Sequence, residues 1–375
     1  MTSEWHEVPL RELVGYISKG IAPSYAEEAS ESTIRVLNQK CNRNFRISYG
    51  DSRLHDTRKK KVPPERYVKP DDILINSTGA GTAGRIAQIE DVPSATTIDG
   101  HMILIRSNGK VTQKFLGYAL KAHQWEVLQL DEGSTGQTEL NRDRLLDEIM
   151  INYPVSLDEQ NAIVGTLESI DRKLIVNEQL NDNLQQQAQA IYSSMFIDNP
   201  DPAWSHGHLS DLITVKYGKD HKKLADGIYP VYGSGGIMRY VERPLYNKES
   251  VLIPRKGTLN NVMYVNQPFW SVDTMFYTEM KLPNVAKFVY HFVKAKDLAS
   301  MNAGSAVPSM TTDILNAMEV VIPSASALEE FESLVAPMYE AMEANDVQSK
   351  ALSQMRDTLL PKLMSGAIDV SDVQL

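Results

Sequence analysis

Residues 157–196 read LDEQNAIVGTLESIDRKLIVNEQLNDNLQQQAQAIYSSMF, and this stretch decides the fold. Ten of its positions form a mostly apolar row whose steps alternate between four and three residues: Ile163, Leu167, Ile170, Leu174, Asn177, Asn181, Leu184, Ala188, Ile191 and Met195. A mean step of about 3.5 residues is typical of the seam of a coiled coil. The same spacing returns 168 positions later, at Phe331, Val335, Met338, Met342, Asn345, Ser349, Leu352, Arg356, Leu359 and Leu363. The sequence therefore predicts two long helices that pair with each other.

Both rows become polar at their middle two positions. If the helices pack antiparallel, the rows meet about their middles, where polar residues fix the register at some cost in stability. The pairs expected in this register are Asn177 with Ser349, Asn181 with Asn345, and Arg356 with Ile170. We interpret the first two as coiled-coil polar layers, with accidental placement as the alternative. For Arg356 we expect a buried stem and a charge that reaches solvent.

Length and charge describe the rest of the chain. Its 375 residues can form two ordinary cores plus connecting helices. The formal net charge is -10, but residues 1–155 carry 20 Lys and Arg against 21 Asp and Glu, and residues 203–325 carry 13 against 10. The acidity therefore lies in the helical segments, and the globular parts can present a surface to phosphate. Because Cys41 is the only cysteine, an internal disulfide and a cysteine-cluster metal site are excluded.

The two globular parts resemble each other. Asp72-Ile73-Leu74-Ile75 before Gly79 is similar to Ser250-Val251-Leu252-Ile253 before Gly257. We predict an α+β fold with an internal pseudo-two-fold repeat, in which two similar mixed α/β domains are separated by two long helices forming an antiparallel coiled coil. The expected boundaries are 1–155 for the first domain, 156–200 for the central helix, 201–325 for the second domain, 326–367 for the C-terminal helix and 368–375 for a flexible tail.

A glycine-rich stretch raises the question of a nucleotide site. Residues 79–84, GAGTAG, match the spacing of a dinucleotide-binding loop, which requires a helix to follow. Here residues 85–89, RIAQI, alternate like a strand, so a glycine-rich turn between strands is favoured. The sequence contains no other phosphate-loop, metal-ligand or nucleophile motif, and no catalytic residue is predicted. No apolar window is long enough to span a membrane, which favours a soluble, cytoplasmic protein.

Cations and amides gather at positions suited to nucleic acid. Residues 35–61 hold nine cations interleaved with Asn and Gln, the side chains that pair with guanine and adenine edges. The candidates in the first domain are Arg35, Asn38, Lys40, Arg43, Arg46, Arg58, Lys59, Lys60, Lys61, Ser77, Thr78, Arg85, Ser134, Thr135 and Gln137. Those in the second are Lys219, Lys222, Lys223, Arg239, Arg255, Lys256, Asn260 and Ser305. A merely solvated face, or ordinary turn chemistry in the loops, is the alternative.

This arrangement resembles the specificity subunit of type I restriction-modification enzymes over essentially the whole chain. The resemblance is carried by Trp5 to Leu13, Asp72 to Gly79, Ile98-Asp99-Gly100, Gly133 to Gln137, Ile151 to Pro154 with Glu159-Gln160, the helix to Phe196, and second-half counterparts ending in Leu359 to Gly366. One departure is that Leu328-Glu329-Glu330 stands where a second Glu-Gln pair would be expected.

The resemblance implies a non-catalytic, DNA-binding subunit of a bacterial defence system. Each target-recognition domain would read one half of a bipartite target in double-stranded DNA, and the helix pair would fix the spacer and dock two methyltransferase subunits. S-adenosylmethionine, ATP and Mg would then belong to the methyltransferase and restriction (motor) subunits, with no cofactor or metal on this chain. Two alternatives remain: a stand-alone two-domain coiled-coil protein that binds RNA or protein, and a nucleotide-dependent enzyme using Gly79 to Gly84.

Overall fold

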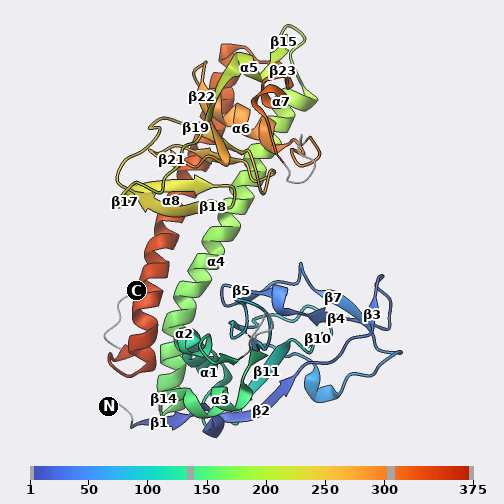
Figure 1. The fold of residues 1–375 in the computed structure, drawn as a ribbon, viewed down its shortest axis with the longest axis vertical. Helices are drawn as coiled ribbons and strands as arrows, with labels where there is room; N and C mark the ends of the chain where they lie inside the picture. The colour runs from blue at the N-terminus through green and yellow to red at the C-terminus, as the bar shows by residue number, and fades with distance from the viewer. Residues whose placement is uncertain (1–3, 133–138, 302–308, 371–375) are drawn as a thin grey trace. The chain divides into compact units, whose positions relative to one another are not determined.

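The computed structural model describes residues 4–132, 139–301 and 309–370 (Figure 1). The chain forms two compact units: unit 1 comprises residues 1–176 and 348–375, and unit 2 comprises residues 177–347. Helices α4 (Leu157–Ser193) and α8 (Ala325–Met364) each contribute residues to both units. The mixed helix and strand content and the two long helices confirm the predicted α+β class.

Unit 1 is built on two four-stranded sheets. The first has the order β2-β11-β8-β9, and the second has the order β10-β4-β7-β3 with β10 parallel to β4. Their strands are β2 (Val14–Lys19), β11 (Met102–Ser107), β8 (Ile73–Asn76), β9 (Ile86–Gln88), β10 (Thr96–Ile98), β4 (Thr33–Leu37), β7 (Arg53–Asp56) and β3 (Tyr25–Ala26). The two-stranded pairs are β1 (Trp5–Pro9) with β14 (Met150–Pro154), β5 (Asn42–Arg43) with β6 (Arg46–Ile47), and β12 (Asp131–Glu132) with β13 (Glu139–Leu140).

Short helices complete unit 1. They are η1 (Leu10–Glu12), η2 (Gln39–Cys41), η3 (Pro64–Arg66), α1 (Gln113–Ala122), α2 (Gln124–Val127) and α3 (Arg142–Glu148). Helix α1 begins with Thr112 as its N-cap, whose side chain accepts from the Phe115 backbone N–H. Its apolar face packs into one core with β8, β11 and the unit 1 parts of α4 and α8, where Leu167 and Leu363 are fully buried. The long helices are thus part of the core of the unit.

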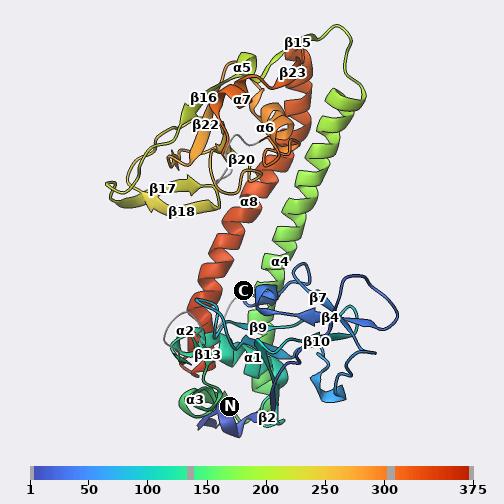
Figure 2. The ribbon, with the colours of Figure 1, turned by 45° about the vertical axis from the view of Figure 1, so that its right-hand side comes forward.

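Unit 2 repeats this topology with shorter connections. Its sheets have the orders β16-β22-β19-β20 and β18-β17-β21, and β15 pairs with β23. The strands are β15 (Ser205–His208), β16 (Ile213–Tyr217), β17 (Asp226–Gly233), β18 (Gly236–Val241), β19 (Ser250–Pro254), β20 (Met263–Val265), β21 (Trp270–Ser271), β22 (Met275–Met280) and β23 (Glu319–Ile322). The helices are the π-helical turn η4 (Ser194–Asp198), α5 (Leu209–Leu212), α6 (Ala286–Lys294) and α7 (Thr312–Asn316). Figure 2 shows the β17–β18 hairpin at the margin of unit 2.

The long helices run antiparallel inside unit 2. The Asn345 side-chain amide donates to Asn181 Oδ1 over 2.8 Å, and the Phe196 and Phe331 ring centroids lie 5.2 Å apart. As the residue number rises along α4, that of its partner falls along α8. Asn181 and Asn345 therefore form the polar contact expected from the sequence. Asn177 donates instead to the Asn345 carbonyl over 3.4 Å. Because Ser349 belongs to unit 1 and Asn177 to unit 2, their layer stays a prediction.

Arg356 corrects one expectation from the sequence. Its Nη1 donates to Asp171 Oδ1 over 3.2 Å, and its Nη2 to Asp357 Oδ1 over 2.8 Å. The side chain is 19% exposed. The charge therefore does not reach solvent alone: it pairs with Asp171 inside unit 1 and with Asp357, whose side chain is 66% exposed.

Candidate nucleic-acid interface

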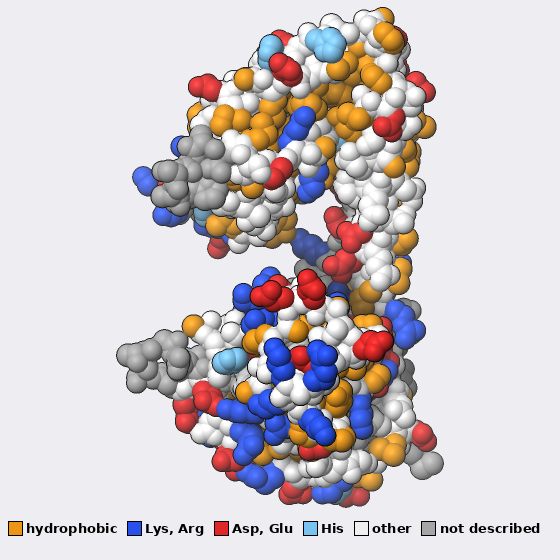
Figure 3. Space-filling view, turned by 90° about the vertical axis from the view of Figure 1, so that its right-hand side faces the viewer, with side chains coloured by type: hydrophobic (Ala, Val, Ile, Leu, Met, Phe, Trp, Pro, Cys, Tyr) orange, Lys and Arg blue, Asp and Glu red, His pale blue; other side chains and the backbone are white. Residues whose placement is uncertain are grey.

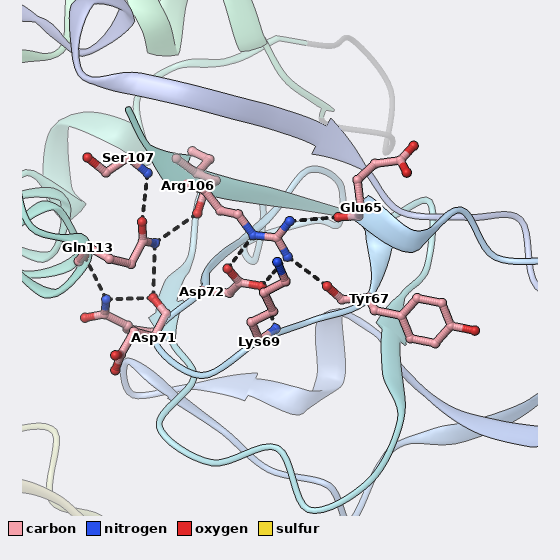
Figure 4. A network of polar contacts seen from close by, with 10 residues as sticks. Glu65, Tyr67, Lys69, Asp71, Asp72, Arg106, Ser107 and Gln113 are labelled. Atoms are coloured by element: carbon pink, nitrogen blue, oxygen red, sulfur yellow. Dashed lines mark hydrogen bonds and ion pairs between the residues drawn. The ribbon is translucent and has the colours of Figure 1, made fainter. Parts of the chain in front are cut away.

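A buried ion pair between the adjacent strands β8 and β11 supports the candidate site of unit 1 (Figure 4). The Arg106 guanidinium on β11 contacts Asp72 at both carboxylate oxygens, each over 2.7 Å. Arg106 also donates to the Glu65 and Tyr67 carbonyls, and Asp72 accepts the Lys69 N–H. Hydrogen bonding to Asp72 raises the pKa of Arg106, outweighing the cost of its burial. Every group in the pair is thus satisfied, and the start of β8 is held in place.

The turn that follows β8 brings distant parts of unit 1 together. Gly79 has a φ of 117°, a conformation that favours glycine, and a Cβ added there would lie 2.8 Å from Gln39 Oε1. The Asn76 side chain donates to the Gln39 carbonyl over 3.2 Å, and Thr78 Oγ1 donates to Gln39 Oε1 over 3.4 Å. We call Gln39, Thr78 and Gly79 the glycine corner of unit 1. It joins the end of β4 to the β8–β9 turn.

Unit 2 forms the same corner from different side chains. Gly257 follows β19 with a φ of 86°, and an added Cβ would lie 2.6 Å from Ser234 Oγ. The Asn261 amide donates to the Ser234 carbonyl over 2.9 Å. Ser234 follows β17, the strand parallel to β21, as Gln39 follows β4, the strand parallel to β10. Ser234, Lys256 and Gly257 are therefore the glycine corner of unit 2.

The element that follows the glycine corner of unit 1 shows whether residues 79–84 have the structure of a dinucleotide-binding loop. Residues 79–84 form a turn, and the next element is strand β9, which pairs antiparallel with β8. A dinucleotide loop needs a helix N-terminus at that point. The interpretation of residues 79–84 as a glycine-rich turn between strands is confirmed.

A later segment also meets each corner. Thr78 forms a bridge with Glu139, and Lys256 forms one with Ser309. These segments follow directly on residues 133–138 and 302–308. The predicted contacts Ser134, Thr135, Gln137 and Ser305 fall within those two stretches, which lie outside the described residues.

Cations of unit 1 fall into two groups. Lys40, Arg43 and Arg46 are exposed on η2, β5 and β6, which are tied to the corner because the Asn42 amide donates to Asn76 Oδ1 and to the Arg85 carbonyl. The second group follows β7 and comprises Arg58, Lys59, Lys60 and Lys61. Figure 3 shows Lys and Arg side chains gathered on one face of this unit. Unit 1 thus carries a surface suited to phosphate.

Contacts within the protein engage several of these candidates. Arg35 donates to Ser52 Oγ over 3.1 Å. Arg58 pairs with Asp56 over 3.3 Å, and this hydrogen bond lowers the pKa of Asp56. Lys60 Nζ donates to the Ala22 carbonyl over 2.9 Å. Lys59 and Lys61 are exposed. Arg35 and Lys60 therefore help to hold the fold as well as adding charge.

Four further candidates near the corner differ in how accessible they are. Ser77 is fully buried, so its predicted contact with DNA is not possible in this conformation. Asn38 caps η2, accepting the Lys40 N–H and donating to the Asp51 carbonyl. The Thr78 hydroxyl lies 2.7 Å from His101 Nδ1, and Arg85 donates to the Gly81 carbonyl. Thr78 and Arg85 remain partly exposed beside the turn.

In unit 2 the candidates occupy the loops around the corner. Lys219, Lys222 and Lys223 are exposed before β17, and Lys256 is exposed after β19. Arg255 donates to the Asp273 carbonyl and lies 5.4 Å from the Tyr217 ring.

Two unit 2 candidates are committed to local structure. Arg239 is held by Asp226 and the Leu224 carbonyl, at 2.7 and 3.0 Å. Both ends of the Asn260 amide are engaged, by Asp297 Oδ1 and by the Ala299 N–H. Their roles in the structure are to brace the loops that carry the exposed lysines.

Apolar side chains beside the second corner were not predicted. Ile237 is 49% exposed and Met238 is 61% exposed, on the strand that follows the Gly233–Gly236 turn. The sequence GIMRYV at 236–241 has the composition of a half-buried strand, so spacing gave no reason to select them. Only their exposure in the folded unit identifies them.

Charged groups also meet where α1 packs against α4 in unit 1. Tyr118 and Lys121 both donate to Asp171, at 2.9 and 3.0 Å, beside a cavity of about 240 Å³. Burial raises the pKa of Asp171, but its contacts with Lys121, Tyr118 and Arg356 outweigh burial and hold that pKa below its usual value. Among the described residues no group of three or more His, Cys, Asp or Glu could hold a metal ion.

Comparison with known proteins shows what the repeated units are. The model of the type I restriction modification DNA specificity domain matches residues 2–186 and 203–330. The chain belongs to this family. The type I restriction enzyme MjaIX specificity subunit of Methanocaldococcus jannaschii is 24% identical over 323 residues, covering 74% of each chain. A putative type I specificity subunit of Mycoplasma genitalium is 23% identical over 270 residues, covering 67% of this chain and 70% of that one.

A solved structure shares the fold. The crystal structure of the type I restriction-modification S subunit from M. genitalium aligns with a TM-score of 0.62 and 18% identity over 96% of each chain. The family assignment gives this protein the function of DNA target recognition. The comparisons support neither an RNA- or protein-binding bridge nor a nucleotide-dependent enzyme. Within the described residues, no helix has the length and apolar character needed to cross a bilayer.

Proposed function

We propose that each unit reads one half of a bipartite DNA target through its glycine corner and the cations around it. The observation that carries the proposal is that the corner is built twice. Gly79 against Gln39 and Gly257 against Ser234 join equivalent strands while presenting different side chains. A repeated frame with unlike surface residues suits two readers that dock alike and recognise different bases.

The cations supply a grip on phosphate in this proposal. In unit 1 these are Lys40, Arg43, Arg46 and the run from Arg58 to Lys61; in unit 2 they are Lys219, Lys222, Lys223, Arg255 and Lys256. Phosphate contacts fix the register of the protein on the duplex, whereas contacts with base edges carry sequence information. Thr78, Arg85 and the exposed side chains beside each corner are the candidates for the second task.

Partner subunits would supply the chemistry. The helical segments 156–202 and 326–375 carry 2 and 3 cations against 8 and 9 acidic residues, so they are poor surfaces for DNA. We propose that they seat two methyltransferase subunits that bind S-adenosylmethionine, with ATP and Mg used by restriction subunits. This chain would then determine which DNA sequence is bound and would contribute no reacting group.

Helix length would set the unread spacer between the half-sites. Because α4 and α8 contribute to both units, inserting one heptad into each helix lengthens the connection by about 10 Å, or about three base pairs. The insertion points are after Val176 and after Val347, where the units divide. We expect the spacer to grow while both half-sites keep their sequence. A changed half-site sequence with an unchanged spacer would contradict this role.

Methylation mapping tests the proposal as a whole. Cells carrying the full chain with its methyltransferase partner are expected to modify one bipartite sequence. A gel-shift titration of the purified chain on that duplex should show an affinity that falls steeply with salt. A single continuous target, or equal affinity for unrelated duplexes and single-stranded RNA, would overturn the proposal.

A further inference from the structure

The β17–β18 hairpin of unit 2 exposes two adjacent apolar side chains. Tyr232 pairs with Ile237 and Val231 pairs with Arg239, so Met238 is an extra residue on β18. Such a bulge interrupts the alternation of faces along a strand. It explains why both Ile237 and Met238 are exposed, at 49% and 61%, although they are neighbours. Bulges re-aim side chains, and this one turns two apolar groups outward.

The two side chains have a defined position beside the glycine corner. A Cβ added at Gly233 would lie 2.6 Å from Met238 Sδ, so the thioether lies directly over the backbone of the turn. The same turn is fastened by the Asn261 hydrogen bond to the Ser234 carbonyl and by the contact of Ser234 with Gly257. Ile237 and Met238 are therefore held in a fixed place relative to Lys256.

The charges around the turn suit DNA. Lys219, Lys222 and Lys223 lie in the loop before β17, which is anchored because Trp270 Nε1 donates to the Lys219 carbonyl over 2.9 Å. Arg255 and Lys256 lie in the loop on which Ser234 packs. Against these five cations stand Asp220 in the loop before β17 and Asp273 in the β21–β22 connection, whose carbonyl accepts from Arg255, which leaves a positive balance. Exposed apolar side chains beside cationic loops fit a duplex whose phosphates flank its base edges.

We propose that Ile237 and Met238 contact thymine methyl groups in the major groove of the half-site bound by unit 2. The inference rests on the proposed function of the two units. The apex between β17 and β18 is Gly233-Ser234-Gly235-Gly236, and its Ser234 carbonyl already accepts from Asn261. Aliphatic side chains offer no donor or acceptor to a base edge, but they pack on the C5 methyl group that distinguishes thymine.

Unit 1 differs at the equivalent place. Its β4–β7 connection contains η2, β5 and β6 and presents Lys40, Arg43 and Arg46. These side chains can donate to guanine or to phosphate but gain little from a methyl group. The half-site bound by unit 1 should therefore not depend on thymine methyls in the same way.

Deoxyuridine substitution tests the inference, because it removes only the methyl group. Once the target is mapped, the full chain is titrated against duplexes with thymine or deoxyuridine in either half-site. We expect deoxyuridine in the unit 2 half-site to weaken binding roughly three- to tenfold, the loss typical of one or two buried methyls. Deoxyuridine in the other half-site should change affinity less than twofold.

Two variants locate the contact, and a third is the matched control. Ile237→Ser and Met238→Ser should lose a similar factor on the thymine duplex and show no further loss on the deoxyuridine duplex. Ile228→Ser, at the opposite end of the hairpin and 78% exposed, should behave as wild type.

The inference would be overturned if the half-site bound by unit 2 contained no thymine, or if the wild-type chain bound both duplexes with equal affinity. It would also be overturned if the loss caused by each variant multiplied the loss caused by deoxyuridine, because the two changes would then act independently. Losses independent of the methyl group, with a kinked duplex, would indicate a wedge between base steps and also overturn it. Failure of the full chain to bind any duplex specifically would instead reject the proposed function.

Discussion

The two units use different chemistry at the start of two equivalent strands, β8 in unit 1 and β19 in unit 2. In unit 1 strands β8 and β11 are joined by the Asp72–Arg106 ion pair, with Asp72 only 3% exposed. In unit 2 strands β19 and β22 are joined by the hydroxyls of Ser250 and Thr278, where Ser250 Oγ donates to the Thr278 carbonyl over 2.8 Å. Strand pairing is retained in both. The frame therefore needs satisfied polar groups at this point, whether charged or neutral.

The short helix that packs on the long helices, α1 in unit 1 and α6 in unit 2, shows a similar contrast between charged and neutral contacts. In unit 1, Tyr118 of α1 donates to Asp171, which also binds Lys121 and Arg356. In unit 2 the equivalent position of α6 is His291, which lies 2.9 Å from the Tyr339 hydroxyl and 2.8 Å from Gln189 Oε1. Both junctions share a Lys–Glu ion pair, Lys114 with Glu168 in unit 1 and Lys287 with Glu332 in unit 2, each over 2.6 Å. They differ beside it: charges surround Tyr118, whereas aromatic rings and neutral hydrogen bonds surround His291. The two units should consequently respond differently to mutation and to pH.

The largest effect is expected from breaking the buried ion pair. Arg106→Met leaves the Asp72 carboxylate buried without its partner, which should lower the free energy of unfolding of unit 1 by about 3–5 kcal/mol. Urea denaturation followed by circular dichroism measures this loss.

The neutral counterpart supplies the control for that measurement. Ser250→Ala removes one hydroxyl of the unit 2 pair and should cost only about 1–2 kcal/mol. The double variant Asp72→Leu with Arg106→Met should recover part of the loss, because no charge is left unpaired. Equal losses for Arg106→Met and Ser250→Ala would show that burial of charge is not what separates the units.

Acid should distinguish the two helix junctions. Complete burial lowers the pKa of His291 to about 4, below its value of about 6.5 in an unfolded chain. The unfolded state therefore takes up the proton first, so unit 2 keeps full stability above pH 6.5 and should lose about 3 kcal/mol as the pH falls towards 4. His291→Gln should abolish this loss in urea titrations at pH 7, 5.5 and 4.5. A variant as acid-sensitive as the wild type would exclude His291 as the cause.

Alanine at the corner glycines tests whether the two corners are equivalent. Gly79→Ala and Gly257→Ala force a side chain into a left-handed conformation, the first against Thr82 and Gln39 and the second against Ser234, so each should cost about 1–2 kcal/mol. Gly81→Ala also has a positive φ but meets nothing within 4 Å, and should cost less. Thermal unfolding of the three variants gives the ranking. A loss at Gly79 without a matching loss at Gly257 would deny the equivalence.

The smallest effect is expected from exposed lysines. Lys59 and Lys61 in unit 1 and Lys222 and Lys223 in unit 2 would each add phosphate attraction, so either double alanine variant should flatten the slope of log affinity against log salt by at most about 2. Lys60 is left in place because it bonds to the Ala22 carbonyl. Lys173→Ala on the exposed side of α4 is the control in the same gel-shift titration. An unchanged slope for one pair would remove that unit's run from the interface.

Sequence patterns predicted the helices and the two domains better than they predicted which distant residues come into contact. The heptad spacing and repeated motifs predicted the helices and the two similar domains, because both depend on residues close in sequence. The glycine corner depends on Gln39 meeting Gly79, which only the tertiary fold brings together. Ser77 was selected for its hydroxyl, yet it is buried beside β8. Ile237 and Met238 were missed because a bulge leaves no mark in a hydrophobic pattern.

The division of the long helices has a consequence for synthesis on the ribosome. Unit 2 is one continuous stretch, whereas unit 1 combines residues 1–176 with residues 348–375. Leu360 and Leu363 belong to the same core as Leu10 and Leu13. The part of the protein that is translated first must therefore wait for the last helical turns before its core is complete, and unit 2 can fold in the interval.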